Sequence, residues 1–305
     1  MMNQLLEGFK DYLRIQSVSV HTLYSYLHSV GEYITWYEKK FGLQFKTLHK
    51  ENISEYIKVL KLNRNQKGKL ISPRTVNAKL SGLRTFNQYL KKEGLIEHII
   101  IGRNSFQKVQ NSIASPVKFE KEDVEKFFQV ILECREPKNE RECMRDYALA
   151  KLMALTGCRI SEALMLSFED INLEFREITI RYGKGNKTRV VYMNNELSRI
   201  LKRYLKDYRC KFRLSEMSPY IFLSNRSMDM KRAAVNRIFK KYSYLANLQM
   251  VLSPHDLRHY FCSQAIKSGL SIHEVANICG HSSINTTSIY TNVSRKELYH
   301  KMDSL

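Results

Sequence analysis

Residues 251–290 of this chain read VLSPHDLRHYFCSQAIKSGLSIHEVANICGHSSINTTSIY and hold four histidines. His255 and Arg258 are three residues apart, a spacing that puts both side chains on one face of a helix. Ser253, which is followed by a proline, is typical of the residue just before a helix begins. The stretch therefore predicts a helix that presents a histidine and an arginine side by side.

A second helix is expected from residue 272 to residue 278, because apolar side chains recur there and Gly280 is a typical helix end. His281 follows the glycine, and Tyr290 comes nine residues later. Alone, each residue has an ordinary explanation, since most histidines lie at the surface or in packing contacts and most tyrosines beside an isoleucine belong to a core. Their conjunction points to chemistry only if another part of the chain supplies partners.

The segment TGCRISEAL at residues 156–164 is such a partner. A long apolar helix is expected to end at Gly157, and Arg159 then begins the next helix. The helix macrodipole disfavours a positive charge at this end of a helix. An arginine beside free backbone N–H groups is understandable where an anion has to bind.

A glycine-flanked lysine forms the third element. The sequence RYGKGNKTRVVYM, from residue 181 to residue 193, contains the ends of two expected strands. These strands span residues 178–182 and 190–192, with residues 183–186 as the hairpin turn. A turn that holds two glycines can carry Lys184 outward on its tip.

The order and spacing of these positions resemble the tyrosine recombinases, also called the phage integrase family, and most closely their Xer-type and mobile-element resolvase members. The resemblance rests on Arg159 in TGCRISE, Lys184 in GKGNK, HDLRH at residues 255–259, the GH pair ending at His281, and Tyr290. It covers about residues 118–305 by motif and the earlier chain by domain layout. It implies a site-specific recombinase that cuts and rejoins double-stranded DNA at a recombination site.

The chemistry of these residue types agrees with the resemblance. Attack on a DNA phosphodiester builds negative charge on the non-bridging oxygens, and two arginines supply bidentate donors that stay charged at any working pH. A 3′-phosphotyrosyl bond conserves the energy of the broken phosphodiester, so strand exchange and religation through a Holliday junction need neither ATP nor metal, and no cofactor is expected. The resemblance implies that Tyr290 is the nucleophile and that Arg159, Arg258 and His281 bind the scissile phosphate. It further implies that Lys184 protonates the leaving 5′-oxygen and that His255 assists proton transfer. Glu162 and His259 would support these residues.

Composition indicates a polyanionic partner. Fifty Lys and Arg residues against 30 Asp and Glu give a net charge of +20, which is typical of a protein that binds nucleic acid. We expect no membrane partner, because the chain has no apolar run of 18 residues and no signal peptide. Six cysteines without a CxxC motif predict reduced thiols in the cytoplasm, where the protein would associate with the nucleoid. No third and fourth ligand accompanies His255 and His259, so no metal site is expected.

Hydrophobic periodicity predicts a mainly α protein with a small antiparallel β-sheet. Residues 1–102 read as a domain of four helices, in which Ser19 and Ser72 are expected to begin the second and the fourth. The resemblance makes it a SAM-like core-binding domain that clamps DNA. Residues 103–117 are polar and lack periodicity, which favours a linker, and residues 118–305 form the catalytic domain of mixed α/β type. Within it we expect a helix at residues 195–208 and a short strand at residues 220–223.

Two basic segments are candidates for contact with DNA phosphates. One is the loop between the third and fourth expected helices, and the other is a helix in the catalytic domain. A run of charge is ordinarily a solvated surface, but on a strongly basic protein we favour phosphate contact. The candidate residues are Lys61, Arg64, Lys67, Lys69, Arg232, Arg237, Lys240 and Lys241.

The segment after Tyr290 is the candidate contact between protomers. Family analogy implies a homo-tetramer on synapsed DNA, and in an expected helix at residues 294–302, Leu298 and Met302 share one face. The ordinary alternative is that both side chains pack on their own domain. Two other functions stay open: a DNA-binding protein without chemistry, and a type IB-like topoisomerase that nicks and reseals DNA without exchange.

Overall fold

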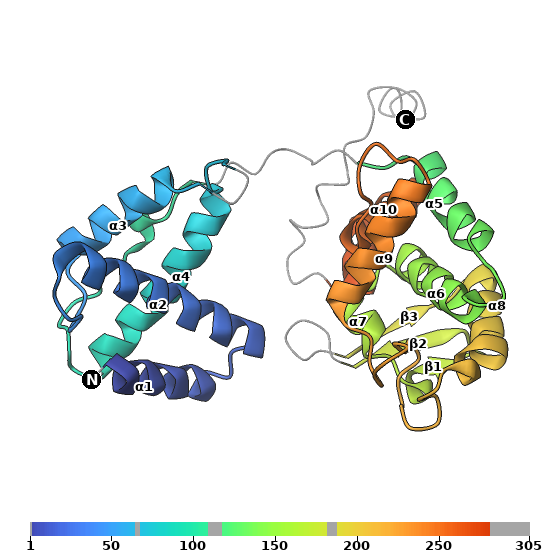
Figure 1. The fold of residues 1–305 in the computed structure, drawn as a ribbon, viewed down its shortest axis with the longest axis horizontal. Coiled ribbons are helices and arrows are strands. Elements are labelled where there is room, and N and C mark those ends of the chain that lie inside the picture. The colour runs from blue at the N-terminus through green and yellow to red at the C-terminus, as the bar shows by residue number, and fades with distance from the viewer. Residues whose placement is uncertain (1, 65–67, 109–117, 182–187, 281–305) are drawn as a thin grey trace. The chain divides into compact units, whose positions relative to one another are not determined.

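The structure is a computed structural model that describes residues 2–64, 68–108, 118–181 and 188–280. The chain falls into two compact units, Met1–Asn111 and Ser112–Leu305. Each unit has its own buried apolar core. Figure 1 traces both along the chain.

The first unit is a set of four helices, as the periodicity predicted. Ser19 and Ser72 cap the second and fourth of them, because each side chain accepts a hydrogen bond from the backbone N–H three residues on. Phe9, Tyr33 and Phe86 are fully buried between the helices. The helices are α1 (Met2–Ile15), α2 (Val20–Phe41), α3 (Lys50–Leu62) and α4 (Pro73–Lys92), followed by the 3-10 turn η1 (Arg103–Ser105).

The start of the expected linker is attached to the first unit. Phe106 packs against the core of this unit. The side chain of Asn77 both donates to the Gln107 carbonyl and accepts from the Gln107 N–H, each at 2.9 Å. Residues 103–107, which we expected to be linker, are therefore fixed on α4, and residues 109–117 lie outside the described residues.

The second unit is built around α6. Most of its side chains are buried, because α5, α7, α8 and α10 all contact it, and it occupies the middle of this unit in Figure 1. The helices are α5 (Lys121–Glu133), α6 (Glu140–Thr156), α7 (Ile160–Leu164), α8 (Asn195–Arg203), α9 (Arg232–Leu245), α10 (Pro254–Lys267) and α11 (Ile272–Cys279), with short turns at η2 (Phe168–Asp170), η3 (Tyr204–Tyr208) and η4 (Arg209–Lys211).

A three-stranded antiparallel sheet completes the second unit. Its order is β1 (Ile171–Asn172), β2 (Glu177–Ile180) and β3 (Arg189–Tyr192). In this sheet Ile180 pairs with Arg189, the pair nearest the hairpin turn. The expectation of a mainly helical protein with a small antiparallel sheet is confirmed.

Two local expectations differ from the structure. Residues 220–223 are not a strand: their backbone makes only an isolated bridge between Tyr220 and Ser167, and the apolar run is buried because it fills the core. The helix expected to run from 195 to 208 is α-helical only to Arg203, after which η3 continues it as a π-helical turn. The helix expected at residues 294–302 lies outside the described residues.

Candidate functional site

The end of α6 sets the position of Arg159. Gly157 closes the helix in the left-handed conformation, with φ 64°, which a glycine adopts without strain. Arg159 then stands at the N-cap of α7, where its backbone N–H donates to Glu162 Oε2 at 2.8 Å. Its side chain is 28% exposed, so the guanidinium is held by the protein and still open to solvent.

A second arginine reaches the same place from α10. The side chain of Ser253 accepts from the Asp256 N–H and the Asp256 carboxylate accepts from the Ser253 N–H, which fixes the first turn of this helix. Arg258 follows on α10 and is only 3% exposed. Its Nη1 donates to the Gly157 carbonyl at 2.5 Å, which ties α10 to the end of α6.

The two arginines meet at the C-terminal end of α11. Arg258 Nη2 donates to the Cys279 carbonyl at 2.7 Å, and Arg159 Nη1 donates to the same oxygen at 3.4 Å. Arg159 Nη2 donates to the Gly280 carbonyl at 2.9 Å. Gly280 ends the helix in the left-handed conformation, with φ 63°. Both guanidinium groups therefore contact the backbone that directly precedes His281 in the sequence.

The carboxylate of Glu162 is buried and pairs with Arg159. The side chain of Glu162 is 2% exposed, and Oε1 accepts from Arg159 Nη1 at 2.8 Å. Burial pushes the pKa of Glu162 upward, but hydrogen bonds from Arg189 and from the Arg159 backbone, together with the arginine charges, outweigh it and lower the pKa. Glu162 is therefore ionised at neutral pH. Arg189 was not among the residues expected at this site.

The two histidines of α10 lie in contact. The rings of His255 and His259 are 4.3 Å apart between centroids and meet edge to face. Desolvation by the surrounding protein and then the charge of Arg258 lower the pKa of His255. Burial and the neighbouring His255 lower the pKa of His259 to about 4. Both rings are therefore neutral near pH 7.

Comparison with known proteins identifies the family. Residues 118–297 match the model of the phage integrase family, and residues 5–97 match that of its N-terminal SAM-like domain. The chain belongs to the phage integrase family. It is a tyrosine site-specific recombinase, an enzyme that cleaves and rejoins DNA.

Three similar proteins illustrate this relationship. TnP I resolvase of Bacillus thuringiensis is 39% identical over 297 residues, which cover 97% of this chain and 98% of that protein. Tyrosine recombinase XerA of Pyrococcus furiosus is 30% identical, with 98% and 92% covered. The post-cleavage complex of the XerH recombinase with its difH substrate has a TM-score of 0.71 at 22% identity, with 94% and 81% covered, which shows a shared fold.

The structure places part of the expected site of the recombinase. Arg159, Arg258 and Glu162 come together around the end of α11, and His255 lies on α10, three residues before Arg258. Four expected residues lie outside the described residues: Lys67, Lys184, His281 and Tyr290. Among the described residues, no three His, Cys, Asp or Glu side chains gather in a way that could hold a metal ion.

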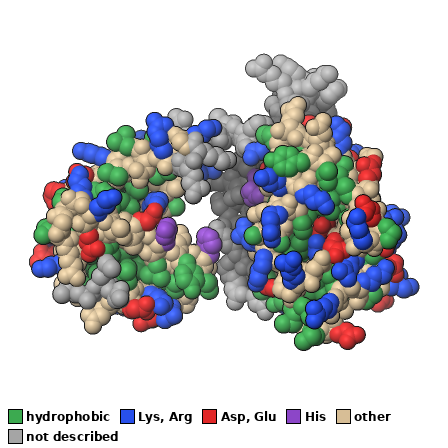
Figure 2. Space-filling model, in the orientation of Figure 1, with side chains coloured by type: hydrophobic (Ala, Val, Ile, Leu, Met, Phe, Trp, Pro, Cys, Tyr) green, Lys and Arg blue, Asp and Glu red, His purple; other side chains and the backbone are tan. Residues whose placement is uncertain are grey.

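The expected DNA-contacting cations that the structure describes are all exposed. Arg232, Arg237, Lys240 and Lys241 are exposed on α9, and Val235 and Phe239 of the same helix are buried. In the first unit, Lys61, Arg64 and Lys69 are exposed at and beyond the end of α3. Figure 2 shows Lys and Arg side chains over much of the visible face of the second unit. Within the described residues, no helix is long and apolar enough to cross a membrane.

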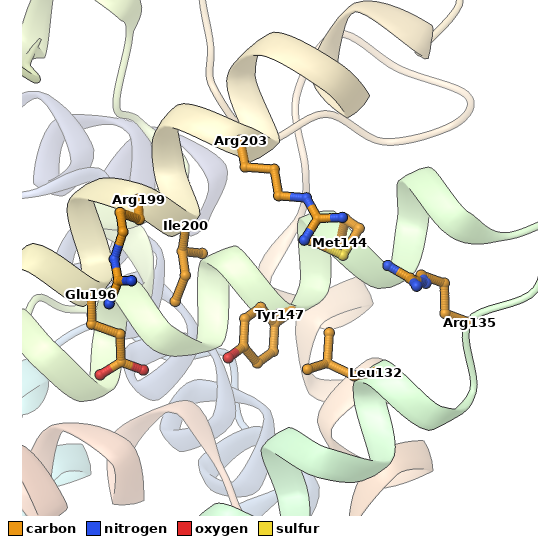
Figure 3. A pocket seen from close by; sticks show the side chains of 8 residues that line it. All are labelled: Leu132, Arg135, Met144, Tyr147, Glu196, Arg199, Ile200 and Arg203. Carbon is orange, nitrogen blue, oxygen red and sulfur yellow. The ribbon is translucent and has the colours of Figure 1, made fainter.

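A separate hollow of about 390 Å³ opens among α5, α6 and α8. Tyr147 and Ile200 line this hollow together with the arginines Arg135, Arg199 and Arg203. In Figure 3 the Tyr147 and Ile200 side chains lie between Arg199 and the other two arginines. No residue expected in the recombinase site lines this hollow.

Proposed function

We propose that this recombinase cleaves DNA by attack of Tyr290 on a phosphodiester. The convergence of Arg159 and Arg258 on the carbonyls of Cys279 and Gly280 carries the proposal. These guanidinium groups come from segments about a hundred residues apart, yet they meet at the peptide that leads directly into His281. That arrangement brings two permanent positive charges to one place, as a phosphoryl transition state requires.

The reaction follows from the charges involved. The Tyr290 phenolate attacks phosphorus, a 3′-phosphotyrosyl bond forms, and the bond from phosphorus to the 5′-oxygen breaks. Charge that builds on the non-bridging oxygens is stabilised by Arg159 and Arg258, with His281 as a further hydrogen-bond donor. Attack by the 5′-hydroxyl of another strand reverses these steps, and exchange proceeds through a Holliday junction without ATP or a metal ion.

Proton transfer needs one group at each end of the reaction. The position of His255 on α10, three residues before Arg258, supports its role in accepting the proton of Tyr290, and its lowered pKa keeps the ring neutral near pH 7. Lys184 protonates the leaving 5′-oxygen. Glu162 holds Arg159 in place, and His259 supports His255 through ring contact.

The wider assembly is also part of this proposal. The core-binding domain expected at residues 1–102 clamps a double-stranded recombination site together with the catalytic domain, residues 118–305. Four protomers assemble on synapsed DNA through the tail after Tyr290, in the cytoplasm at the nucleoid. The phosphate contacts are Lys61, Arg64, Lys67, Lys69, Arg232, Arg237, Lys240 and Lys241.

Trapping of a covalent adduct tests the proposal. The protein is incubated with nicked duplexes from its own gene neighbourhood, and DNA-linked protein is separated by denaturing electrophoresis. Tyr290→Phe should abolish the adduct and leave binding to the duplex nearly unchanged, while Tyr260→Phe serves as the matched control. An adduct that survives Tyr290→Phe would place the nucleophile elsewhere. Relaxation of supercoiled DNA without strand exchange at any site would favour the type IB-like activity.

A further inference from the structure

Arg189, the first residue of β3, joins three parts of the second unit. Its Nη1 and Nη2 donate to the two carboxylate oxygens of Glu162, at 3.1 and 2.7 Å. Its Nε donates to the Ile278 carbonyl at 2.8 Å. One planar guanidinium therefore connects β3 to α7 and to the last turn of α11.

The two hydrogen bonds from Arg189 complete the hydrogen bonding of the Glu162 carboxylate. Oε1 accepts from Arg159 Nη1 and from Arg189, and Oε2 accepts from the Arg159 backbone and from Arg189. With both oxygens doubly occupied, the carboxylate is fixed in one orientation. Because Glu162 is buried, loss of one partner would leave a desolvated negative charge to be satisfied by Arg159 alone.

The hydrogen bond from Arg189 Nε to the Ile278 carbonyl holds the backbone next to the carbonyl that Arg159 and Arg258 share. Ile278 immediately precedes Cys279, whose carbonyl accepts from both Arg159 and Arg258. Arg189 also lies directly against Gly280: a Cβ atom built on this glycine would be 3.1 Å from Arg189 Nη1. The guanidinium of Arg189 therefore supports the helix end that precedes His281.

The guanidinium of Arg189 is bound within the protein. Each of its three nitrogens donates to a protein acceptor, and its side chain is only 14% exposed. Arg159, which pairs with the same carboxylate, is more exposed, at 28%.

We propose that Arg189 is a positioning residue that sets Arg159 through Glu162 and sets the peptide before His281 through Ile278. This inference rests on the proposed function, since it assigns Arg159 and His281 to the scissile phosphate. Because Arg189 lies at the start of β3, the same guanidinium connects the β2–β3 strand pair to a peptide 89 residues away in the sequence.

Two variants of Arg189 and one control test the effect on cleavage. Arg189→Met should lower the rate of adduct formation by roughly ten- to a hundredfold, because a small displacement of reacting groups has effects of this size. The affinity for duplex DNA should stay unchanged. Arg189→Lys restores the charge but cannot fork, so it should recover only part of the rate. Arg176→Met, at the exposed far end of the same hairpin, should cleave like wild type.

A double variant separates positioning from direct contact. If Arg189 acts through Glu162, the loss in Arg189→Met/Glu162→Gln falls short of the product of the two single losses. A product of independent effects, or a fall in DNA affinity for Arg189→Met, would instead indicate a direct phosphate contact and overturn the proposal. Wild-type cleavage by Arg189→Met would also overturn it.

Hydrogen exchange of the free protein tests the positioning without any DNA. Amide exchange at the end of α11, Ile278–Gly280, should be faster in Arg189→Met than in wild type and unchanged in Arg176→Met. Arg189→Lys, which keeps the charge, gives the same comparison if the methionine variant does not fold. Equal exchange in the Arg189 variants and wild type would reject the proposal. A wild-type protein that forms no adduct would reject the proposed function, and the exchange result would still decide the role of Arg189.

Discussion

Replacement of Gly157 by alanine tests how closely the peptide between the two arginines is packed. Gly157 has φ 64°, and a residue with a Cβ atom costs about 1 kcal/mol in this conformation. The added Cβ would lie 2.4 Å from Phe261 Cδ1 and 2.9 Å from Cys279 Sγ. Both atoms belong to side chains, so relief of the overlap requires the Phe261 ring and the Cys279 thiol to shift.

Gly269 supplies the matched control in the same unit. Its φ is 95°, and nothing lies within 4 Å of an added Cβ. Gly269→Ala therefore strains the backbone conformation but causes no steric overlap. We expect Gly157→Ala to destabilise the second unit by about 1–3 kcal/mol more than Gly269→Ala does, the usual cost of overpacking. For a unit of this size, that difference lowers the melting temperature by roughly 2–12 °C.

Thermal unfolding of both variants, followed by circular dichroism, measures this difference. Adduct formation at a temperature where both are folded should also fall in Gly157→Ala alone. The reason is that movement of Cys279 displaces the carbonyl that accepts from both arginines. Equal melting temperatures for the two variants would refute the packing argument, and equal cleavage would show that the arginines tolerate the shift.

Four further outcomes are expected. Arg159→Ala and Arg258→Ala should each lower cleavage by about a hundredfold, on the order of 3 kcal/mol of transition-state stabilisation, as measured by single-turnover rates. EDTA should leave wild-type cleavage unchanged, and loss of activity in EDTA would contradict the metal-free reaction. A substrate with a 5′-bridging sulfur, whose leaving group needs no proton, should restore cleavage to Lys184→Ala, and failure to do so would remove the lysine as the acid. The pKa of His259 is lowered from 6.5 to about 4, so the unfolded chain takes up this proton first and stability falls as the pH drops from about 6.5 to 4; urea denaturation should show a smaller fall for His259→Gln. Deletion of residues 295–305 should leave half-site binding intact and reduce cooperative binding and recombination, and unchanged cooperativity in gel-shift titrations would make the tail ordinary packing.

The parts of the fold that follow local rules were predictable from the sequence. Ser19, Ser72 and Ser253 were expected to begin helices, and each side chain accepts the hydrogen bond that makes it a cap. Gly157 and Gly280 were expected to end helices, and both are left-handed C-caps. These positions are predictable because a cap depends on a few neighbouring residues.

Features that depend on distant partners were not predictable. Ile221–Leu223 is an apolar run of strand-like composition, but it is buried as irregular chain because the core requires its side chains and no neighbouring strand is there to pair with it among the described residues. Arg189 is one of many arginines in the sequence. Its partners lie 27 and 89 residues away, and no local pattern distinguishes it from a solvated cation.

Three of the hydrogen bonds that assemble the arginine pair span more than a hundred residues. Arg258 reaches Gly157 across 101 residues, and Arg159 reaches Gly280 across 121. Contacts of this separation form late, because the entropy of closing the loop must be overcome before they contribute. During synthesis, a chain that has emerged only as far as α9 has Arg159 and its partner Glu162, but it lacks Arg258 and the end of α11 that both arginines contact. The ability to break DNA is therefore acquired only after nearly the whole second unit has been made and folded, so an incomplete chain that binds DNA cannot cut it.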